Sequence, residues 1–454
     1  MKMLNDQTSR FSKKAHIRYS LRHLRMLPTP YESDDNNRVM FSFFALNSLS
    51  SLGALDQINN DDRKNFIDWI YDKWDNRLGG FYGGTRSDYR ELGSDNQSVD
   101  QPHLTHTYTA LLVLAALSLP TLENKNTVSP FGKLDISKLL QFVKQCQNPD
   151  GSFSGFPVSA EKDVRFVYCA AAILSIVNVD PNTVIDVKST VQYIRSCRTY
   201  EGGYGQGPFN EAQGGTTYCA LASLALLKQL ESGLDDDEAN VTFRWLSDRQ
   251  AEYSETVDGK ESEDEVNCPD SLEEKECVPS LIAGFQGRIG KPLDTCYSFW
   301  CMAAMSVIST RKINKITQTD NYSTVQNYDE SPQYDMNTYC DPIANIEFLL
   351  KCQSKQWGGI CKKLCAHPGM LKNFLIKFFF YLLPSQAYIY HNYLALASLS
   401  LSFSWAIKSN SKSITVNDEY QSNPLEDHDP LLNVPVRVTE WVKKCFAESP
   451  SSDL

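Results

Sequence analysis

Two kinds of helical pattern alternate along the chain. In the first kind, apolar positions recur at helical spacing and charges lie on the opposite face, which predicts helices with one wet side. In the second kind, nearly every position is apolar or small, which predicts helices buried on all sides. The first kind occupies residues 61–76, 135–148, 186–199, 238–250 and 341–354, and the second kind occupies residues 106–119, 165–177, 214–227, 296–308 and 391–402.

Glycine-rich loops join the first kind of helix to the second. They share a Gly-Gly-aromatic or Gly-aromatic theme and fall at residues 76–86, 148–157, 199–208, 282–290 and 355–363. Glycine permits the positive φ that ends a helix, so these loops are interpreted as turns. None matches a phosphate-binding loop between a strand and a helix.

The repeat predicts an all-α fold. Adding residues 37–53 to the buried set and residues 434–448 to the amphipathic set gives six helices of each kind. Six buried helices inside six amphipathic ones would close into an α6–α6 (α/α) barrel. The alternative, an open helical solenoid, would leave the apolar inner runs exposed to water.

A single barrel domain is expected over residues 26–446. A basic segment, 1–25, precedes it and a short tail, 447–454, follows it. Two insertions interrupt the repeat: an acidic loop at 252–279, in which residues 252–276 carry eleven acids against two lysines, and an aromatic, apolar segment at 369–386. The acidic stretch predicts a solvated loop.

Composition narrows the function classes. The net charge of −11 argues against nucleic acid as the main partner. Thirteen cysteines are scattered, mostly within apolar helical stretches, which favours reduced thiols and a cytoplasmic protein. The opening residues are polar and basic, unlike a secretory signal. The longest apolar run, 374–383, is too short to span a bilayer.

The candidate chemistry lies in "RIGKPLDTCYSFW" at 288–300. Asp294 and Cys296 are possible zinc ligands, although such a pair alone is more often a loop acid and a buried thiol. His391 begins the next buried helix at nearly the same place in its repeat, so the three could meet at one end of the barrel. Three protein ligands leave a fourth position open, as in catalytic zinc sites. His103 and His106 flank a helix start and are expected to be caps or surface residues.

The surroundings suggest an amphipathic ligand. Arg288, Lys291 and Tyr297 lie on the same loop as two of the zinc ligands. Aromatic and sulfur side chains are expected at the starts of the buried helices: Tyr168, Tyr218, Cys219, Phe299 and Trp300. A cationic rim above an aromatic hole suits a molecule with a charged head and a long hydrocarbon tail.

Residues 284–300 resemble the zinc and diphosphate segment of protein prenyltransferase β subunits. Residues 163–177 and 199–227 resemble two further blocks of that family, and the resemblance spans about residues 20–405. It implies a zinc ion held by Asp294, Cys296 and His391, a separate α subunit as heterodimer partner, and an isoprenoid diphosphate. It also implies protein substrates with a C-terminal CaaX cysteine motif, such as small GTPases.

The same resemblance implies the remaining site residues. Catalytic roles fall on Asp294, Cys296, His391, Tyr297 and Lys362. Substrate-binding roles fall on Arg165, Tyr168, Gln213, Gly214, Gly215, Cys219, Arg288, Lys291, Tyr297, Ser298, Phe299, Trp300, Met40 and Leu394.

The details are most similar to the type I geranylgeranyltransferase members of the family. Thr295 stands where the farnesyl enzyme has Gly. Met40 and Leu394 replace a larger Trp and Tyr, which leaves room for a geranylgeranyl tail. Lys362 stands where the farnesyl enzyme has a magnesium-binding aspartate, so magnesium is not expected to be required.

The chain departs from the family pattern in two places. Gln213 replaces a histidine that contacts the diphosphate, which predicts weaker binding there. Between Lys362 and His391 the chain has far more residues than the family spacing, and the excess matches 369–386. Our hypothesis is a retained intron or gene-model error; the rival is a genuine insertion that contacts a membrane or partner.

Other functions stay open at this stage. The alternatives are a farnesyltransferase β subunit, a terpene cyclase, and a non-catalytic barrel that serves as a binding scaffold. A cyclase would need an aspartate-rich acid motif. The only aspartate cluster, at 234–239, falls in a linker.

Overall fold

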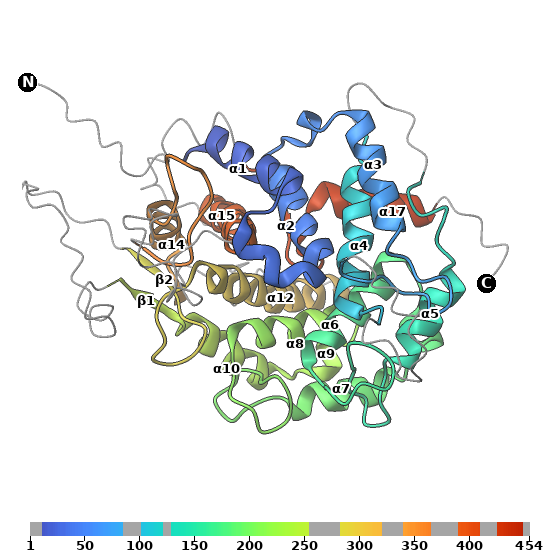
Figure 1. The fold of residues 1–454 in the computed structure, drawn as a ribbon. Helices are drawn as coiled ribbons and strands as arrows, with labels where there is room; N and C mark the ends of the chain where they lie inside the picture. The colour runs from blue at the N-terminus through green and yellow to red at the C-terminus, as the bar shows by residue number, and fades with distance from the viewer. Residues whose placement is uncertain are drawn as a thin grey trace, which may run out of the picture.

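The structure, a computed structural model, describes residues 11–84, 101–120, 129–253, 282–319, 339–364, 389–408 and 425–447. The expected α6–α6 barrel is confirmed (Figure 1). Its inner ring consists of α2 (Arg38–Ser51), α4 (Leu104–Leu117), α6 (Val164–Ile176), α8 (Gly214–Leu226), α12 (Thr295–Thr319) and α15 (Ile389–Lys408). Each inner helix contacts the next one along the chain, and α15 also contacts α2, so the ring is closed rather than open.

The outer helices are amphipathic and begin at polar caps. They are α3 (Asn60–Tyr71), α5 (Ile136–Gln145), α7 (Val187–Ser196), α10 (Asp236–Ser247) and α14 (Pro342–Lys351). In Figure 1, α5, α7, α10 and α14 lie at the edge of the molecule. The side chains before them, for example Asp135 and Asp186, accept a backbone N–H from the first helical turn. Such caps satisfy N–H groups that have no partner within the helix.

The sixth outer position differs from the prediction, which assigned it to residues 434–448. It is taken by α1 (Lys13–Arg25), which packs against α2. Gly151 has φ 82° and lies so close to α7 that an added Cβ would be 2.1 Å from the Ser189 carbonyl; Gly358, with φ 75°, stands in the same relation to the Ala15 carbonyl on α1. The segment 1–25, expected to precede the barrel, therefore contains one of its helices.

The C-terminal helix α17 (Val436–Ala447) instead contacts α4 and α6. The residues just before it enter the inner ring, where tyrosine hydroxyls from four inner helices, α4, α6, α8 and α15, donate to their backbone. Tyr108 donates to the Leu432 carbonyl at 2.7 Å, and Tyr168 donates to the Leu431 carbonyl at 3.0 Å. The segment before α17 thus occupies part of the barrel interior.

The remaining elements are short. They are η1 (Thr29–Asn37), η2 (Leu55–Gln57), η4 (Pro181–Thr183) and α9 (Leu230–Gly233), with the antiparallel pairs β1 (Gln250–Glu252) with β2 (Ala283–Phe285) and β3 (His428–Asp429) with β4 (Val434–Pro435).

The described residues allow the expectations about cysteines and membrane spans to be compared with the structure. The ten cysteines found there are all buried and free, as expected for reduced thiols. Within these residues no helix combines the length and apolar character needed to cross a bilayer. The segment 369–386 and nearly all of the acidic loop lie outside the described residues.

Candidate metal centre

The start of α12 presents two of the expected ligands. Asp294 precedes the helix, and its Oδ1 accepts the Cys296 backbone N–H at 3.0 Å. This capping bond fixes the carboxylate beside the first turn, where Cys296 is only 5% exposed. His391 lies in the first turn of α15, the inner helix that packs against α12.

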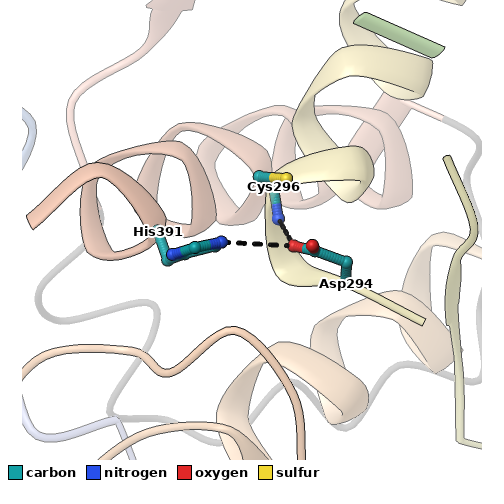
Figure 2. A group of neighbouring side chains, drawn as sticks. All are labelled: Asp294, Cys296 and His391. Carbon is teal, nitrogen blue, oxygen red and sulfur yellow. Dashed lines mark hydrogen bonds and ion pairs between the residues drawn. The ribbon is translucent and has the colours of Figure 1, made fainter. Parts of the chain in front are cut away.

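The three side chains converge (Figure 2). One ligand atom from each of Asp294, Cys296 and His391 lies within 4.8 Å of the others, and His391 Nε2 is 3.6 Å from Asp294 Oδ1. Tetrahedral zinc with bonds of about 2.0–2.3 Å sets neighbouring ligand atoms roughly 3.3–3.8 Å apart. The Asp294–His391 distance of 3.6 Å lies in this range, and the oxygen, sulfur and nitrogen donors are ordinary zinc ligands.

Burial and neighbouring charges affect the protonation of the metal corner, the group formed by Asp294, Cys296 and His391. Burial, followed by the nearby Asp294 carboxylate, raises the pKa of the Cys296 thiol well above its usual value. Burial lowers the pKa of His391. A bound dication would oppose the first effect by stabilising a thiolate, and a neutral imidazole is the form that binds metal.

A positive side chain lies next to the group. Lys362 Nζ is 3.5 Å from Asp294 Oδ2, the carboxylate oxygen that does not face His391. The lysine side chain is 40% exposed, so its ammonium reaches the surface of the site. The corner therefore joins three metal-ligand types to one accessible cation.

The other cations of the α12 loop lie at the rim. Arg288 pairs with Glu211 at 2.6 Å, and both side chains are exposed. Lys291 is exposed. The Tyr297 ring packs against Gly287 and Gly214, so closely that a Cβ on Gly287 would be 2.2 Å from it. Tyr297 thereby links the α12 loop to the start of α8.

An aromatic group continues inward from the metal corner. Trp300 donates from Nε1 to the Tyr390 hydroxyl at 3.2 Å, and its ring lies 5.1 Å from Tyr218 and 5.0 Å from Phe299. Gly215 lies close to the Trp300 ring. These contacts join α8, α12 and α15.

The α6 residues form a separate group. Arg165 pairs with Asp163 rather than with the metal corner. The Tyr168 hydroxyl lies 3.0 Å from that of Tyr108 and 3.1 Å from that of Tyr218. Cys219 is buried.

Three further predicted substrate residues are Ser298, Leu394 and Met40. The Ser298 hydroxyl donates to Asn345 Oδ1 on α14 at 2.7 Å, within a fully buried cluster that also includes Ser402 on α15. Leu394 is fully buried in the core, whereas Met40 is partly exposed. The role of Ser298 in binding a substrate stays a prediction, and its observed contact joins α12 to α14.

The cap expected near His103 is present. His103 precedes α4, and its Nδ1 accepts the Thr105 backbone N–H at 3.1 Å. His106 is partly buried one turn later. Burial lowers the pKa of His103 to about 4 and that of His106 to about 3.

Sequence reasoning missed some residues of the site. The Tyr390 hydroxyl interacts with the Cys296 thiol, and its only signal was its place beside His391. Thr295 holds the loop of Lys362 through two hydrogen bonds. Leu431 and Leu432 accept hydrogen bonds through their backbone carbonyls, and such contacts cannot be predicted from residue type.

Comparison with known proteins identifies the family to which this chain belongs. Residues 11–434 match the model of the prenyltransferase alpha-alpha toroid domain. This chain belongs to the protein prenyltransferase β-subunit family.

The relatives include both substrate types. The geranylgeranyl transferase type-1 subunit beta of Arabidopsis thaliana is 28% identical over 87% of this chain and 86% of its own length. That of Dictyostelium discoideum is 32% identical over 63% of this chain and 74% of its own. The protein farnesyltransferase subunit beta of Schizosaccharomyces pombe is 26% identical over 80% of this chain and 75% of its own length.

A solved structure supports the fold of this prenyltransferase β subunit. Candida albicans protein geranylgeranyltransferase-I complexed with GGPP superposes with a TM-score of 0.66 at 24% identity, covering 96% of this chain and 99% of that one.

Proposed function

We propose that the chain is the catalytic β subunit of a zinc-dependent protein geranylgeranyltransferase type I. It would act in the cytoplasm and transfer geranylgeranyl from geranylgeranyl diphosphate to the cysteine of C-terminal CaaX motifs, on proteins such as small GTPases. The observation that carries the proposal is the buried Asp294, Cys296 and His391 group with Lys362 beside it.

Asp294, Cys296 and His391 would hold the zinc. Bound zinc lowers the pKa of a coordinated thiol and so supplies a thiolate at neutral pH. Burial of the group excludes water from the reacting sulfur. The Asp294 capping bond to Cys296 and the packing of α12 on α15 hold the ligands in place before the substrate arrives.

The leaving diphosphate would meet the chain's own cations. Lys362 lies nearest to the metal ligands, and Arg288 and Lys291 lie on the loop leading into α12. Positive charge placed where negative charge develops lowers the barrier for its departure. We infer that Lys362 supplies the charge for which other prenyltransferases use magnesium, so magnesium would not be required.

The tail would lie along the aromatic group within the ring. Trp300 and Tyr218 offer flat apolar faces there, and the partly exposed Met40 leaves room that a bulkier residue would fill. The room left by Met40 favours the longer geranylgeranyl tail over a farnesyl tail. The farnesyl alternative stays open because a farnesyltransferase β subunit is among the relatives.

The decisive experiment is co-expression with a prenyltransferase α subunit, the partner that we propose. Transfer to CaaX peptides ending in Leu would be measured with both isoprenoid diphosphates, together with zinc content. Faster geranylgeranyl transfer and about one zinc per β chain are expected. Faster farnesyl transfer would favour the farnesyl enzyme. A complex that shows no transfer and contains no zinc would favour a binding scaffold.

A further inference from the structure

The loop that carries Lys362, residues 353–364, is fixed on its outer side by the N-terminal helix. The backbone N–H of Gly359 donates to His16 Nδ1 at 3.0 Å, and His16 Nε2 lies 3.4 Å from Gln353 Oε1. Gly358 and Gly359 have positive φ and lie against α1 so closely that an added Cβ would meet Ala15 or Tyr19 within 3 Å. This face of the loop has no room to shift.

Thr295 holds the inner side of the same loop. Its backbone N–H donates to the Lys362 carbonyl at 2.9 Å, and its hydroxyl donates to the Cys361 carbonyl at 3.0 Å. Thr295 is fully buried, so both bonds are shielded from water. Two consecutive carbonyls of the loop are thus bound by one residue that stands between two expected metal ligands.

These bonds determine where the Lys362 ammonium lies. Asp294 precedes Thr295, so the residue that holds the Lys362 backbone is joined directly to the carboxylate that the ammonium approaches at 3.5 Å. A lysine side chain is long and mobile, and an ion pair whose ammonium is partly exposed to solvent holds it weakly. Fixing the backbone on both sides restricts the volume that the ammonium can sample.

We propose that Thr295 is a positioning residue that places the Lys362 ammonium beside the metal corner, so that this cation faces the leaving diphosphate. The inference rests on the proposed function of Lys362. It adds that the side-chain hydroxyl of Thr295 determines how effectively that cation acts. In the sequence, Thr295 served only to distinguish the geranylgeranyl enzyme from the farnesyl enzyme.

A double-mutant cycle tests this in the co-expressed αβ complex. Thr295→Val removes the hydroxyl with little change of shape, Thr295→Ser keeps it, and Lys362→Ala removes the cation. We expect Thr295→Val to slow single-turnover transfer by about five- to tenfold, as for one misplaced cation, and Thr295→Ser to restore most of the rate. In the Lys362→Ala background, Thr295→Val should have no further effect, because it acts through Lys362.

Two further measurements separate positioning from a merely structural role. Added magnesium should accelerate the Thr295→Val and Lys362→Ala variants while leaving the wild type unchanged. Titration with inorganic diphosphate, which needs no transfer, should show weaker binding in both variants, and zinc content should stay at the wild-type level.

The outcomes are distinguishable. If Lys362→Ala reacts as fast as the wild type, the proposed role of Lys362 is wrong. If Lys362→Ala is slow but Thr295→Val is as fast as the wild type, or lowers the rate equally with and without Lys362, then Thr295 does not act through Lys362 and the inference is overturned.

Discussion

The starts of α6 and α12 use the same backbone device for different chemistry. Before α6, Asp163 Oδ1 accepts the Arg165 backbone N–H at 2.8 Å; before α12, Asp294 Oδ1 accepts the Cys296 backbone N–H at 3.0 Å. In both places an aspartate caps an inner helix through the residue two positions later. Two of the repeats therefore place a buried carboxylate at the start of an inner helix.

The residue two positions later decides what that carboxylate does. At α6 it is Arg165, whose guanidinium binds the second oxygen of Asp163, with Nε at 2.8 Å. At α12 it is Cys296, whose thiol offers a metal ligand, while His391 approaches the carboxylate from the neighbouring helix. Metal-binding capacity thus depends on one substitution within a repeated cap and on one histidine in the adjacent repeat.

The largest expected effect comes from removing the thiol at α12. Cys296→Ala should abolish zinc retention and reduce transfer to background, because two ligands remain where three are needed. The barrel should stay folded, since its apolar rings rather than the metal hold it together. Zinc content, transfer rate and circular dichroism measure this.

Cys301→Ala is the matched control, because Cys301 is a buried thiol on the same helix and is not in the metal-ligand group. A Cys296→Ala protein that keeps its zinc, or one that unfolds, would contradict the prediction.

Asparagine substitutions sharpen the comparison between the two aspartates. Asparagine caps helices as well as aspartate does but binds zinc poorly. Asp294→Asn should therefore keep the stability of α12 and lower zinc affinity by more than about 100-fold, beyond the loss typical of outer-shell changes. Asp163→Asn should leave zinc affinity unchanged.

Asp163→Ala removes the α6 cap altogether and is expected to lower the free energy of unfolding by about 1–2 kcal/mol. Urea denaturation and zinc competition titrations measure both quantities. Equal zinc loss from the asparagine variants at 163 and 294 would show that the two corners are not chemically distinct.

Sequence patterns predicted the metal-ligand group, where residue type carries the signal, but not the shared aspartate cap. Asp294, Cys296 and His391 stood at matching places in consecutive repeats, so a closed ring would bring them together. The pattern failed for α1, because its many basic residues obscure a buried face that includes Ala15, Tyr19 and His23.

The sequence also did not predict the full length of α12 or the contacts made by backbone carbonyls. The apolar run ends at residue 308, yet α12 continues to Thr319. The carbonyls of Leu431 and Leu432 that bind tyrosines inside the ring have no counterpart in residue type.

The start of α4 carries a third cap, which is sensitive to pH. His103 Nδ1 accepts a backbone N–H and so must be unprotonated, and burial lowers the pKa of His103 from 6.5 to about 4. The unfolded chain therefore binds a proton that the folded chain excludes between pH 6.5 and 4. Stability at this site is complete above pH 6.5 and falls as the pH drops toward 4.

His103→Asn keeps a capping acceptor without a titrating group. The variant should lose less stability than the wild type between pH 7 and 5, by about 1–2 kcal/mol. Urea denaturation at both pH values measures the difference, with Asp163→Asn as a control that changes a cap without removing a histidine. Parallel losses in wild type and His103→Asn would show that the His103 cap is not pH-dependent.

The smallest expected effect concerns α8, whose preceding residue does not cap with its side chain. Gln213 makes no side-chain capping bond, and its Oε1 turns toward Gly215 near Trp300. Its amide is therefore placed to meet a ligand on the rim. Gln213→His should tighten binding of geranylgeranyl diphosphate about fivefold, since a charge-assisted hydrogen bond exceeds a neutral one by roughly 1 kcal/mol. The gain should be larger at pH 6 than at pH 8, because the imidazole is more often protonated there. Titration of wild type, Gln213→His and the shorter amide Gln213→Asn with the intact diphosphate at both pH values decides the matter, and unchanged affinity for Gln213→His would mean that this side chain does not reach the phosphates.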